Sequence, residues 1–272
     1  MEERFPRGRR MNLLFWNLAH HDNTELAIRA IKEKDTDIAM LAEHGGIDAK
    51  AIVDTLGPEY REGPSQGGCD KIKSIMKSNL KCQYTHEQSR HSINVIKDGS
   101  RKSFVIAMTH LPDKRSDPDS SARMYEIRQL MAMVRAIEKS KGCEDIVIIG
   151  DLNANPYDSE LLQPDAFNAV LFKDVIRKTR KRTWRGHEFE YLYNPILNWL
   201  SEDPKMYGSF YLSSPTTGPH WNCLDQVLVS PSLMDKVADV EYMRSIGDTN
   251  LLAQIGPKKC ISDHLPLFVT IR

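Results

Sequence analysis

The sequence predicts a single α/β domain with both parallel and antiparallel strands. Short apolar runs alternate with amphipathic helical segments near the N-terminus, an Asp-Gly pair separates two extended segments, and strongly apolar runs return near the C-terminus. At 272 residues the chain is long enough to bury one large core, and α/β folds of this size are commonly undivided. We therefore expect one domain over residues 11–272, preceded by a flexible basic arm at residues 1–10.

The first elements are typical of a β-α-β unit. The apolar runs Asn12–Trp16 and Ile38–Leu41 are short enough for buried strands. Between them, Asn23 and Thr24 offer a cap to a helix over Glu25–Lys34, which has apolar residues on one face.

Antiparallel pairing is predicted further along the chain. Asp98-Gly99 favours positive φ angles and hence a hairpin between Ser92–Ile96 and Ser103–Thr109. No firm structure is expected over Glu59–Gln88, and long loops are expected over Asn155–Asn222 because that stretch is rich in proline and other turn residues. The remaining predicted elements are helices at residues 48–56 and 124–141 and strands at residues 145–150, 224–229 and 265–271.

Composition excludes several classes of protein. Lys plus Arg and Asp plus Glu both number 37, so the net charge gives no general attraction to nucleic acid or membranes. The five cysteines have no CxxC spacing, which argues against a disulfide framework or a structural zinc site and favours a reducing compartment. The first apolar run, Leu13–Trp16, is far too short for a signal peptide or a membrane span. We therefore expect a cytoplasmic protein.

Polar residues gather at the ends of the predicted strands. Asp263 and His264 stand side by side at the start of the last strand, where a carboxylate could hold a cation while an imidazole handles a proton or a phosphate oxygen. An isolated pair of this kind is more often an ordinary turn. The other strand ends supply Asn17, Glu43, His110, Asp151, Asn153 and Asp225.

This set suits phosphate chemistry assisted by a cation. Mg²⁺ prefers one or two carboxylates, here Glu43 with Asp151 or Asp263, and lets a phosphate complete its coordination. Neutral amides such as Asn17 and Asn153 can bind phosphate oxygens without adding repulsive charge. Histidines can donate to the developing negative charge or accept a proton from water.

Six motifs appear in order along the chain: Phe15-Trp16-Asn17, Glu43, Thr109-His110-Leu111, Gly150-Asp151-Leu152-Asn153, Leu224-Asp225-Gln226-Val227-Leu228-Val229-Ser230 and Ser262-Asp263-His264-Leu265-Pro266. In this order they resemble the endonuclease/exonuclease/phosphatase superfamily, which includes DNase I-like nucleases, exonuclease III-type repair enzymes, neutral sphingomyelinases and inositol polyphosphate 5-phosphatases. The resemblance implies a four-layer α/β sandwich, with two mixed sheets face to face and helices outside, and Mg²⁺-dependent hydrolysis of a phosphoester.

The resemblance also implies a role for each residue. Glu43 would be the principal metal ligand, with Asn17 beside metal and phosphate and Asp263 supporting the metal site. Asp151, at the metal site, would position or deprotonate the attacking water, and Asn153 would bond a phosphate oxygen.

Three further residues complete the implied set. His264, oriented by Asp225, would contact the scissile phosphate or act as the base, and His110 would stabilise the transition state from the other side. The choice of base stays open.

Abasic-site repair enzymes usually present a tyrosine where this chain has His110, so that activity is disfavoured. Ala42 stands where the family commonly has glutamine, and Glu59–Gln88 matches no family pattern.

Two segments are candidates for binding substrate. The run Arg177–Arg185 has six basic residues in nine, and within it Arg182 could neutralise a phosphate while Trp184 stacks on a base. An alternative is that this run is a solvated surface. Trp221 and Asn222 are candidates for the wall of the cleft, although core packing is the commoner role of such aromatic residues.

We therefore predict a hydrolase that uses Mg²⁺, with Mn²⁺ as a substitute, and acts as a nuclease or phosphodiesterase on DNA or RNA. The alternative is a phosphatase or phosphodiesterase of inositol phosphates, lipid headgroups or nucleotide-like small molecules. A third hypothesis, a catalytically inactive binding module, is disfavoured because all the expected polar residues are present.

Overall fold

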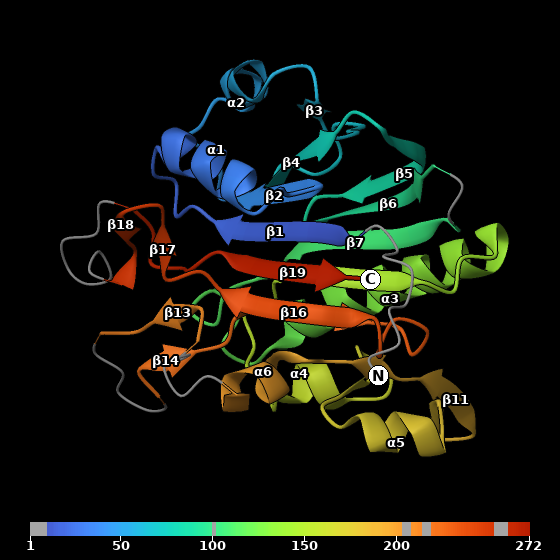
Figure 1. The fold of residues 1–272 in the computed structure, drawn as a ribbon. Helices are drawn as coiled ribbons and strands as arrows, with labels where there is room; N and C mark the ends of the chain where they lie inside the picture. Colours follow the sequence, from blue (N-terminus) through green and yellow to red (C-terminus); the bar gives the residue numbers. More distant parts are fainter. Residues whose placement is uncertain (1–9, 100–101, 203–207, 214–218, 253–260) are drawn as a thin grey trace, which may run out of the picture.

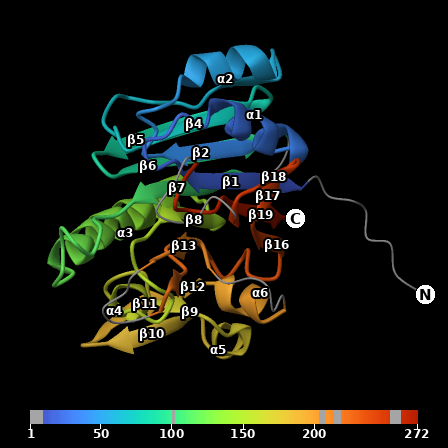
Figure 2. The same ribbon diagram turned by 90° about the vertical axis from the view of Figure 1, so that its left-hand side faces the viewer.

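The computed structural model describes residues 10–99, 102–202, 208–213, 219–252 and 261–272. The arm predicted at residues 1–10 lies outside the described residues except for Arg10. Two large mixed sheets face each other, and helices cover their outer faces (Figures 1 and 2). The predicted four-layer α/β sandwich is thereby confirmed.

The six-stranded sheet contains the predicted β-α-β unit. Strands β1 and β2 are parallel, with Leu13 opposite Ile38, and the other neighbours in this sheet pair antiparallel. Its strands, in spatial order, are β16 (Val237–Tyr242), β19 (Leu267–Ile271), β1 (Met11–Asn17), β2 (Ile38–Ala42), β4 (Ile72–Lys77) and β3 (Tyr60–Glu62).

The seven-stranded sheet contains the predicted hairpin. Strands β6 and β7 pair antiparallel on either side of Gly99, whose φ is +56°. Strands β7 and β8 are parallel, and β8 and β15 are antiparallel. The spatial order is β5 (Leu80–Gln88), β6 (His91–Asp98), β7 (Phe104–His110), β8 (Ile146–Asp151), β15 (Asp225–Val229), β12 (Leu192–Tyr193) and β9 (Ala169–Val170).

Three long helices cover the two sheets. Helices α1 (Thr24–Glu33) and α2 (Ala49–Leu56) lie on the six-stranded sheet, and α3 (Ser121–Lys141) lies on the outer face of the seven-stranded sheet (Figures 1 and 2). Asp48 caps α2 by accepting from the Lys50 N–H at 2.9 Å. The shorter helices α4 (Ser159–Leu162), α5 (Lys173–Lys178) and α6 (Ile196–Glu202) belong to the connection between β8 and β15.

Alternation along the strands divides the core into two clusters. On β7, Val105 and Ala107 join the cluster that contains the buried face of α3, whereas Ile106 and Met108 join the cluster between the sheets. Because successive side chains point to opposite faces of a strand, both faces of this sheet are buried. This explains why its central strands read as continuous apolar runs.

The segment Glu59–Gln88, for which no firm structure was expected, corrects that expectation because it forms β3, β4 and β5. Strand β5 is at the sheet edge and only its first residue, Leu80, is buried. An edge strand tolerates polar residues on both faces, which conceals its pattern. Further strands missed by the sequence pattern form the hairpins β10–β11 (Lys181–Trp184, His187–Glu190), β13–β14 (Phe210–Tyr211, Trp221–Asn222) and β17–β18 (Ser245–Ile246, Thr249–Asn250).

A buried histidine makes stability sensitive to acid. His91 begins β6 and is fully buried, and burial, with a smaller contribution from His86, lowers the pKa of its imidazole from 6.5 to about 4. Between these two values the unfolded chain binds the proton and the folded chain does not, so stability falls as the pH falls from about 6.5 towards 4. We expect this residue to cost about 2 kcal/mol between pH 7 and pH 4.5.

Urea unfolding at the two pH values measures this cost. The His91→Leu variant should lose about 2 kcal/mol less than the unmodified protein on acidification, since it removes only the contribution of this imidazole. Equal losses in the two proteins would contradict the assignment. The matched control is the same substitution at the exposed His187 on the β10–β11 hairpin, which should leave the loss on acidification unchanged.

Among the described residues, no helix is long and apolar enough to cross a membrane.

Candidate active site

Strand register brings three of the predicted site residues together. On the adjacent strands β7, β8 and β15, His110 lies opposite Asp151, and Asp151 lies opposite Asp225. Paired residues share a face, and alternation from Ile106 and Met108 places His110 on the face towards the six-stranded sheet. All three are buried, so the site lies between the sheets at one end of the strands.

A glycine allows β7 and β8 to approach closely beside the site. A Cβ atom on Gly150 would lie 1.8 Å from the backbone oxygen of Thr109, which no side chain can tolerate. Glycine at position 150 therefore preserves the register that places His110 next to Asp151.

Asn17 joins the two sheets at the site. From the end of β1 its Nδ2 donates to Glu43 Oε1 at 3.3 Å and to Asp151 Oδ2 at 3.0 Å. Its Oδ1 accepts from the Ala19 N–H at 3.0 Å, which defines the orientation of the amide. Asn17 therefore lies beside the predicted metal ligands Glu43 and Asp151, with its side-chain oxygen engaged by the backbone and its NH₂ group directed at the two carboxylates.

Asp225 and His264 form a buried pair. Nδ1 of His264 lies 2.7 Å from Asp225 Oδ2. Burial alone would lower the pKa of the imidazole, but Asp225, with a smaller contribution from Asp151, outweighs burial and raises that pKa to about 10. His264 is therefore protonated on both nitrogens at neutral pH, and its Nε2 is a hydrogen-bond donor.

Several contacts hold His264 in place in the loop before β19. Its N–H donates to Ser262 Oγ at 3.0 Å, and that hydroxyl donates to the backbone oxygen of Asn17 at 2.6 Å. Trp16 Nε1 donates to the His264 oxygen at 3.0 Å, and the ring of Phe210 lies 4.9 Å from the imidazole, centroid to centroid. The loop before β19 is thus tied to β1 and to β13.

Oδ2 of Asp151 is the centre of the cluster. Besides Asn17, Nε2 of His110 lies 3.8 Å from it and Nε2 of His264 lies 3.9 Å from it. His110 Nε2 is also 3.6 Å from Glu43 Oε1. These separations are longer than hydrogen bonds, so the two imidazoles surround a space beside Asp151 into which a reacting group can fit.

Asn153 stands behind this centre in a conformation that the turn requires. Its φ is +48°, its N–H donates to Asp151 Oδ1 at 3.0 Å, and its Nδ2 donates to the Leu111 oxygen at 2.9 Å. The Asp151-Asn153 turn orients the carboxylate, and Asn153 also lines the cleft, where its amide carries a second N–H for an anionic oxygen.

The donor set fits a hard divalent cation. The carboxylates of Glu43 and Asp151 are held close enough to share one Asn17 NH₂ group, and a cation would relieve their mutual repulsion. The Glu43 side chain is 29% exposed and therefore accessible from the cleft, and Asp263 lines the same cleft. Asp151, Asp225 and His264 also lie close enough together to be considered a metal-binding group, but Nδ1 of His264 and Oδ2 of Asp225 are already paired.

The cleft has a volume of about 370 Å³. It adds two residues that the sequence did not indicate, Lys114 and Arg115 after β7, and Tyr211 on β13 also lines it. Lys114 pairs with Asp158 at 2.6 Å and Arg115 lies 3.8 Å from Asp113, so the cleft needs a bound cation to suit an anionic ligand. Its lining comprises Ala19, Glu43, Asp113, Lys114, Arg115, Asp151, Asn153, Phe210, Tyr211, Leu212, Ser213, Asn222, Leu224, Asp263 and His264.

The predicted substrate-binding residues lie in different places. Asn222 lines the cleft, whereas Trp221 packs on Tyr211 and on the core between the sheets. Arg182 and Trp184 are on the β10–β11 hairpin, where Arg182 donates to the Leu162 oxygen and neither residue lines the cleft. Any contact they make with substrate would therefore be with a part distant from the reacting phosphate.

Sequence reasoning missed the residues that hold Asp225. Ser209 Oγ accepts from the Leu224 and Asp225 N–H groups at 3.1 and 3.0 Å. Tyr242, which is buried on β16, donates its hydroxyl hydrogen to the backbone oxygen of Asp225 at 2.7 Å. Neither residue belongs to a motif, because these contacts arise only when β13, β15 and β16 meet.

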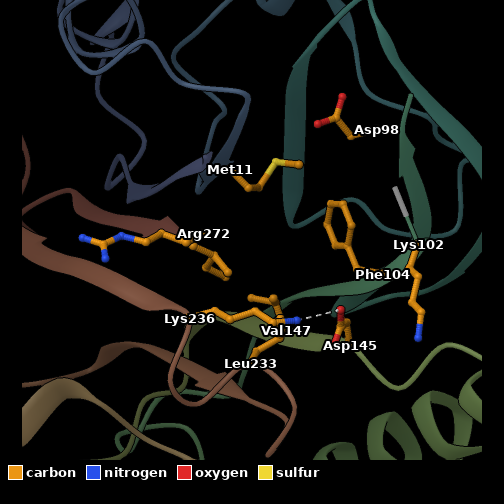
Figure 3. Close-up of a pocket in the computed structure, with 10 residues that line it drawn as sticks. Met11, Asp98, Lys102, Phe104, Asp145, Val147, Leu233, Lys236 and Arg272 are labelled. Carbon is orange, nitrogen blue, oxygen red and sulfur yellow. Dashed lines mark hydrogen bonds and ion pairs between the residues drawn. The ribbon is translucent and has the colours of Figure 1, made fainter. Parts of the chain in front are cut away.

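A second cavity lies at the opposite end of the strands. Its volume is about 280 Å³, and Figure 3 shows Met11, Phe104 and Val147 beside the Asp145–Lys236 ion pair. Met11 and Val147 lie at the starts of strands whose other ends carry Asn17 and Asp151. This cavity is therefore separate from the cluster.

The chain has the DNase I-like endonuclease/exonuclease/phosphatase fold of several solved structures. TDP2 from D. rerio, complexed with a single-strand DNA product, is 14% identical over 97% of this chain and 100% of that chain, with a TM-score of 0.57. ANGEL2, a 2′,3′-cyclic phosphatase in complex with adenosine-2′,3′-vanadate, is 14% identical over 96% and 95%, with a TM-score of 0.63. AP endonuclease LMAP from Leishmania major is 15% identical over 100% and 90%, with a TM-score of 0.57. No family model and no curated protein sequence matches the chain.

Proposed function

We propose that the protein is a metal-dependent phosphodiesterase that hydrolyses phosphoester bonds of nucleic acid. The observation that carries this proposal is the convergence of Asn17, His110 and His264 on a single oxygen, Oδ2 of Asp151, beside the partly exposed Glu43. Carboxylates that can hold a cation, with two imidazoles around one reacting position, suit attack of water on a phosphate.

The protonation of His264 separates the roles of acid and base. Because Asp225 raises its pKa to about 10, His264 keeps its Nε2 proton and donates to a phosphate oxygen rather than accepting a proton. The carboxylate that faces its Nε2 is Asp151, at 3.9 Å, which we assign as the group that orients the attacking water and accepts its proton. The water oxygen bonds to phosphorus, the ester P–O bond breaks, and the leaving oxygen takes up a proton.

The other residues position the phosphate. Glu43 and Asp151, with Asp263 nearby, would hold a divalent cation such as Mg²⁺, which supplies charge neutralisation to the phosphate oxygens when bound. His110 faces the same space from β7 and would donate to an oxygen on the other side of the phosphate. Asn17 keeps the two carboxylates aligned and Asn153 keeps Asp151 in its turn.

Nucleic acid is the favoured substrate because a protein of the same fold was solved with a single-strand DNA product. Lys114 and Arg115 line the cleft in ion pairs with Asp158 and Asp113, and they would exchange these carboxylates for flanking phosphates. The second candidate is a nucleotide-like small molecule, which ANGEL2 with its adenosine vanadate and the modest cleft volume of about 370 Å³ support.

A substrate panel with matched variants tests the proposal. Single- and double-stranded DNA, RNA, nucleotides, inositol phosphates and sphingomyelin are each incubated with Mg²⁺, with Mn²⁺ and with a chelator. We expect metal-dependent cleavage of a nucleic acid and a loss of at least about 10³-fold in the Asp151→Asn variant.

Asp54→Asn on α2 is the matched control, because this exposed carboxylate forms its ion pair with Lys50 on the helix surface. It should keep full activity. Equal activity in Asp151→Asn and the unmodified protein would refute the proposal, and binding of nucleic acid without any cleavage would favour the inactive binding module instead.

A further inference from the structure

A histidine that carries no role so far lies next to the principal predicted metal ligand. Nε2 of His20 is 3.5 Å from Glu43 Oε2, on the opposite side of that carboxylate from His110, which approaches Oε1. The His20 side chain is 70% exposed, so it lies at the surface rather than in the core, next in sequence to Ala19, which lines the cleft. The two histidines thus flank Glu43.

The backbone holds His20 in this place. Its N–H donates to the Glu43 oxygen at 2.9 Å, next to the Leu18 N–H, which donates to the Ala42 oxygen at 3.0 Å. Ala19, His20 and Glu43 have φ angles of +48°, +60° and +47°, a conformation that costs free energy in residues other than glycine. Such conformations concentrate at functional sites.

A glycine makes the close packing of this loop possible. A Cβ atom on Gly46 would lie 2.6 Å from the His20 oxygen, so any side chain there would push the loop away from Glu43. The position of His20 is therefore built by two segments, Leu18–His21 and Glu43–Gly46, and does not depend on the imidazole alone.

The separation of the two side chains suits a shared cation better than a hydrogen bond. At 3.5 Å the imidazole nitrogen and the carboxylate oxygen are too far apart for a good hydrogen bond. Two ligands each about 2.1 Å from one metal ion, at octahedral or tetrahedral angles, are about 3.0 to 3.5 Å apart.

We propose that His20 and Glu43 bind the catalytic cation together, and that the site consequently prefers Mn²⁺ to Mg²⁺. Mg²⁺ takes oxygen ligands, whereas imidazole nitrogen favours transition metals. The inference rests on the proposed function, because it concerns the metal of the same site.

Calorimetric titration of the full chain with MnCl₂ and with MgCl₂ tests the inference. We expect the unmodified protein to bind Mn²⁺ at least about tenfold more tightly than Mg²⁺. His20→Ala should weaken Mn²⁺ binding about tenfold and change Mg²⁺ binding less than about twofold. His21→Ala is the matched control, since the neighbouring histidine should leave both affinities unchanged.

A spectroscopic measurement separates ligation from a general effect on the loop. Electron spin echo modulation of bound Mn²⁺ should show imidazole nitrogen in the unmodified protein and in His21→Ala, and a weaker nitrogen signal in His20→Ala. Unchanged Mn²⁺ affinity and an unchanged nitrogen signal in His20→Ala would overturn the inference. A rise in KM alone would not rescue it, because it would indicate that His20 contacts substrate rather than the metal. Failure of the unmodified protein to bind either cation would instead refute the proposed function.

Discussion

Replacing Asp225 by asparagine should lower kcat by about 10³-fold without unfolding the protein. Asp225 Oδ2 accepts from Nδ1 of His264, which directs Nε2 towards Asp151, and its charge keeps the imidazole protonated. An asparagine has nearly the same shape but carries no charge. The substitution therefore weakens the hydrogen bond that Nε2 of His264 donates to the phosphate, while the packing is kept.

The pH profile provides a second measurement on the same variant. With its pKa at about 10, His264 stays protonated well above neutral pH, so activity that depends on the protonated form should persist into the alkaline range. In Asp225→Asn the pKa of His264 should fall, and activity should be lost at lower pH as the imidazole gives up its proton.

Asp145→Asn is the control for both measurements, because this carboxylate lies just before β8, at the opposite end of the strand from Asp151, and pairs with Lys236. It should change neither kcat nor the alkaline limb. A kcat of Asp225→Asn within about threefold of the unmodified enzyme would remove Asp225 and the orientation of His264 from the mechanism.

Replacing Arg123 by alanine should destabilise the fold by about 3 to 5 kcal/mol. Arg123 is 1% exposed in the first turn of α3. Its Nε and Nη2 each donate to Glu160 Oε1 at 3.1 Å, and its Nη1 donates to the Pro112 oxygen at 3.0 Å. Removal of the guanidinium leaves the buried carboxylates of Glu160 and Asp117 without their cation, which is the costly way to break a buried pair.

Chemical unfolding measures this loss, with Arg128→Ala as the control on the same helix. Arg128 pairs with Asp165 but its side chain is 48% exposed, so its removal should cost less than about 1 kcal/mol. An Arg123→Ala midpoint as high as that of Arg128→Ala would contradict the prediction. Because Arg123 also anchors Pro112, next to Asp113 and the rim residues Lys114 and Arg115, reduced activity at temperatures well below unfolding should accompany the loss.

The sequence was informative where chemistry is local. Short aliphatic runs such as Ile146–Gly150 predict buried strands, which places the polar residues immediately after them, such as Asp151 and Asn153, at the strand ends. The β-α-β unit around α1, the hairpin at Gly99 and the long helix α3 were predicted for the same reason, since turn, cap and periodicity signals act within a few residues.

The sequence was uninformative where a pattern depends on distant neighbours. Strands β3 and β5 lie at sheet edges, which tolerate polar residues, and β4 lies between β2 and β3 with lysines among its apolar residues. Their extended form therefore depends on the pairs β2–β4, β3–β4 and β5–β6. Arg182 and Trp184 belong to a run that is suited to nucleic acid, yet the β10–β11 hairpin places them outside the cleft.

The sequence by itself determined the mixed α/β class and the polar residues from which a phosphate site can be built, because hydrophobic periodicity and strand-end position are properties of short segments. The arrangement in four layers was implied only by the family resemblance of its motifs. Tertiary structure alone decided how these residues act. The amide nitrogen of Asn17 faces the carboxylates because its side-chain oxygen accepts from the Ala19 N–H. His264 is a proton donor because the carboxylate of Asp225 is buried against it. Hydrogen-bond orientation and pKa depend on distances between residues far apart in the chain, and only the packed sheets set those distances.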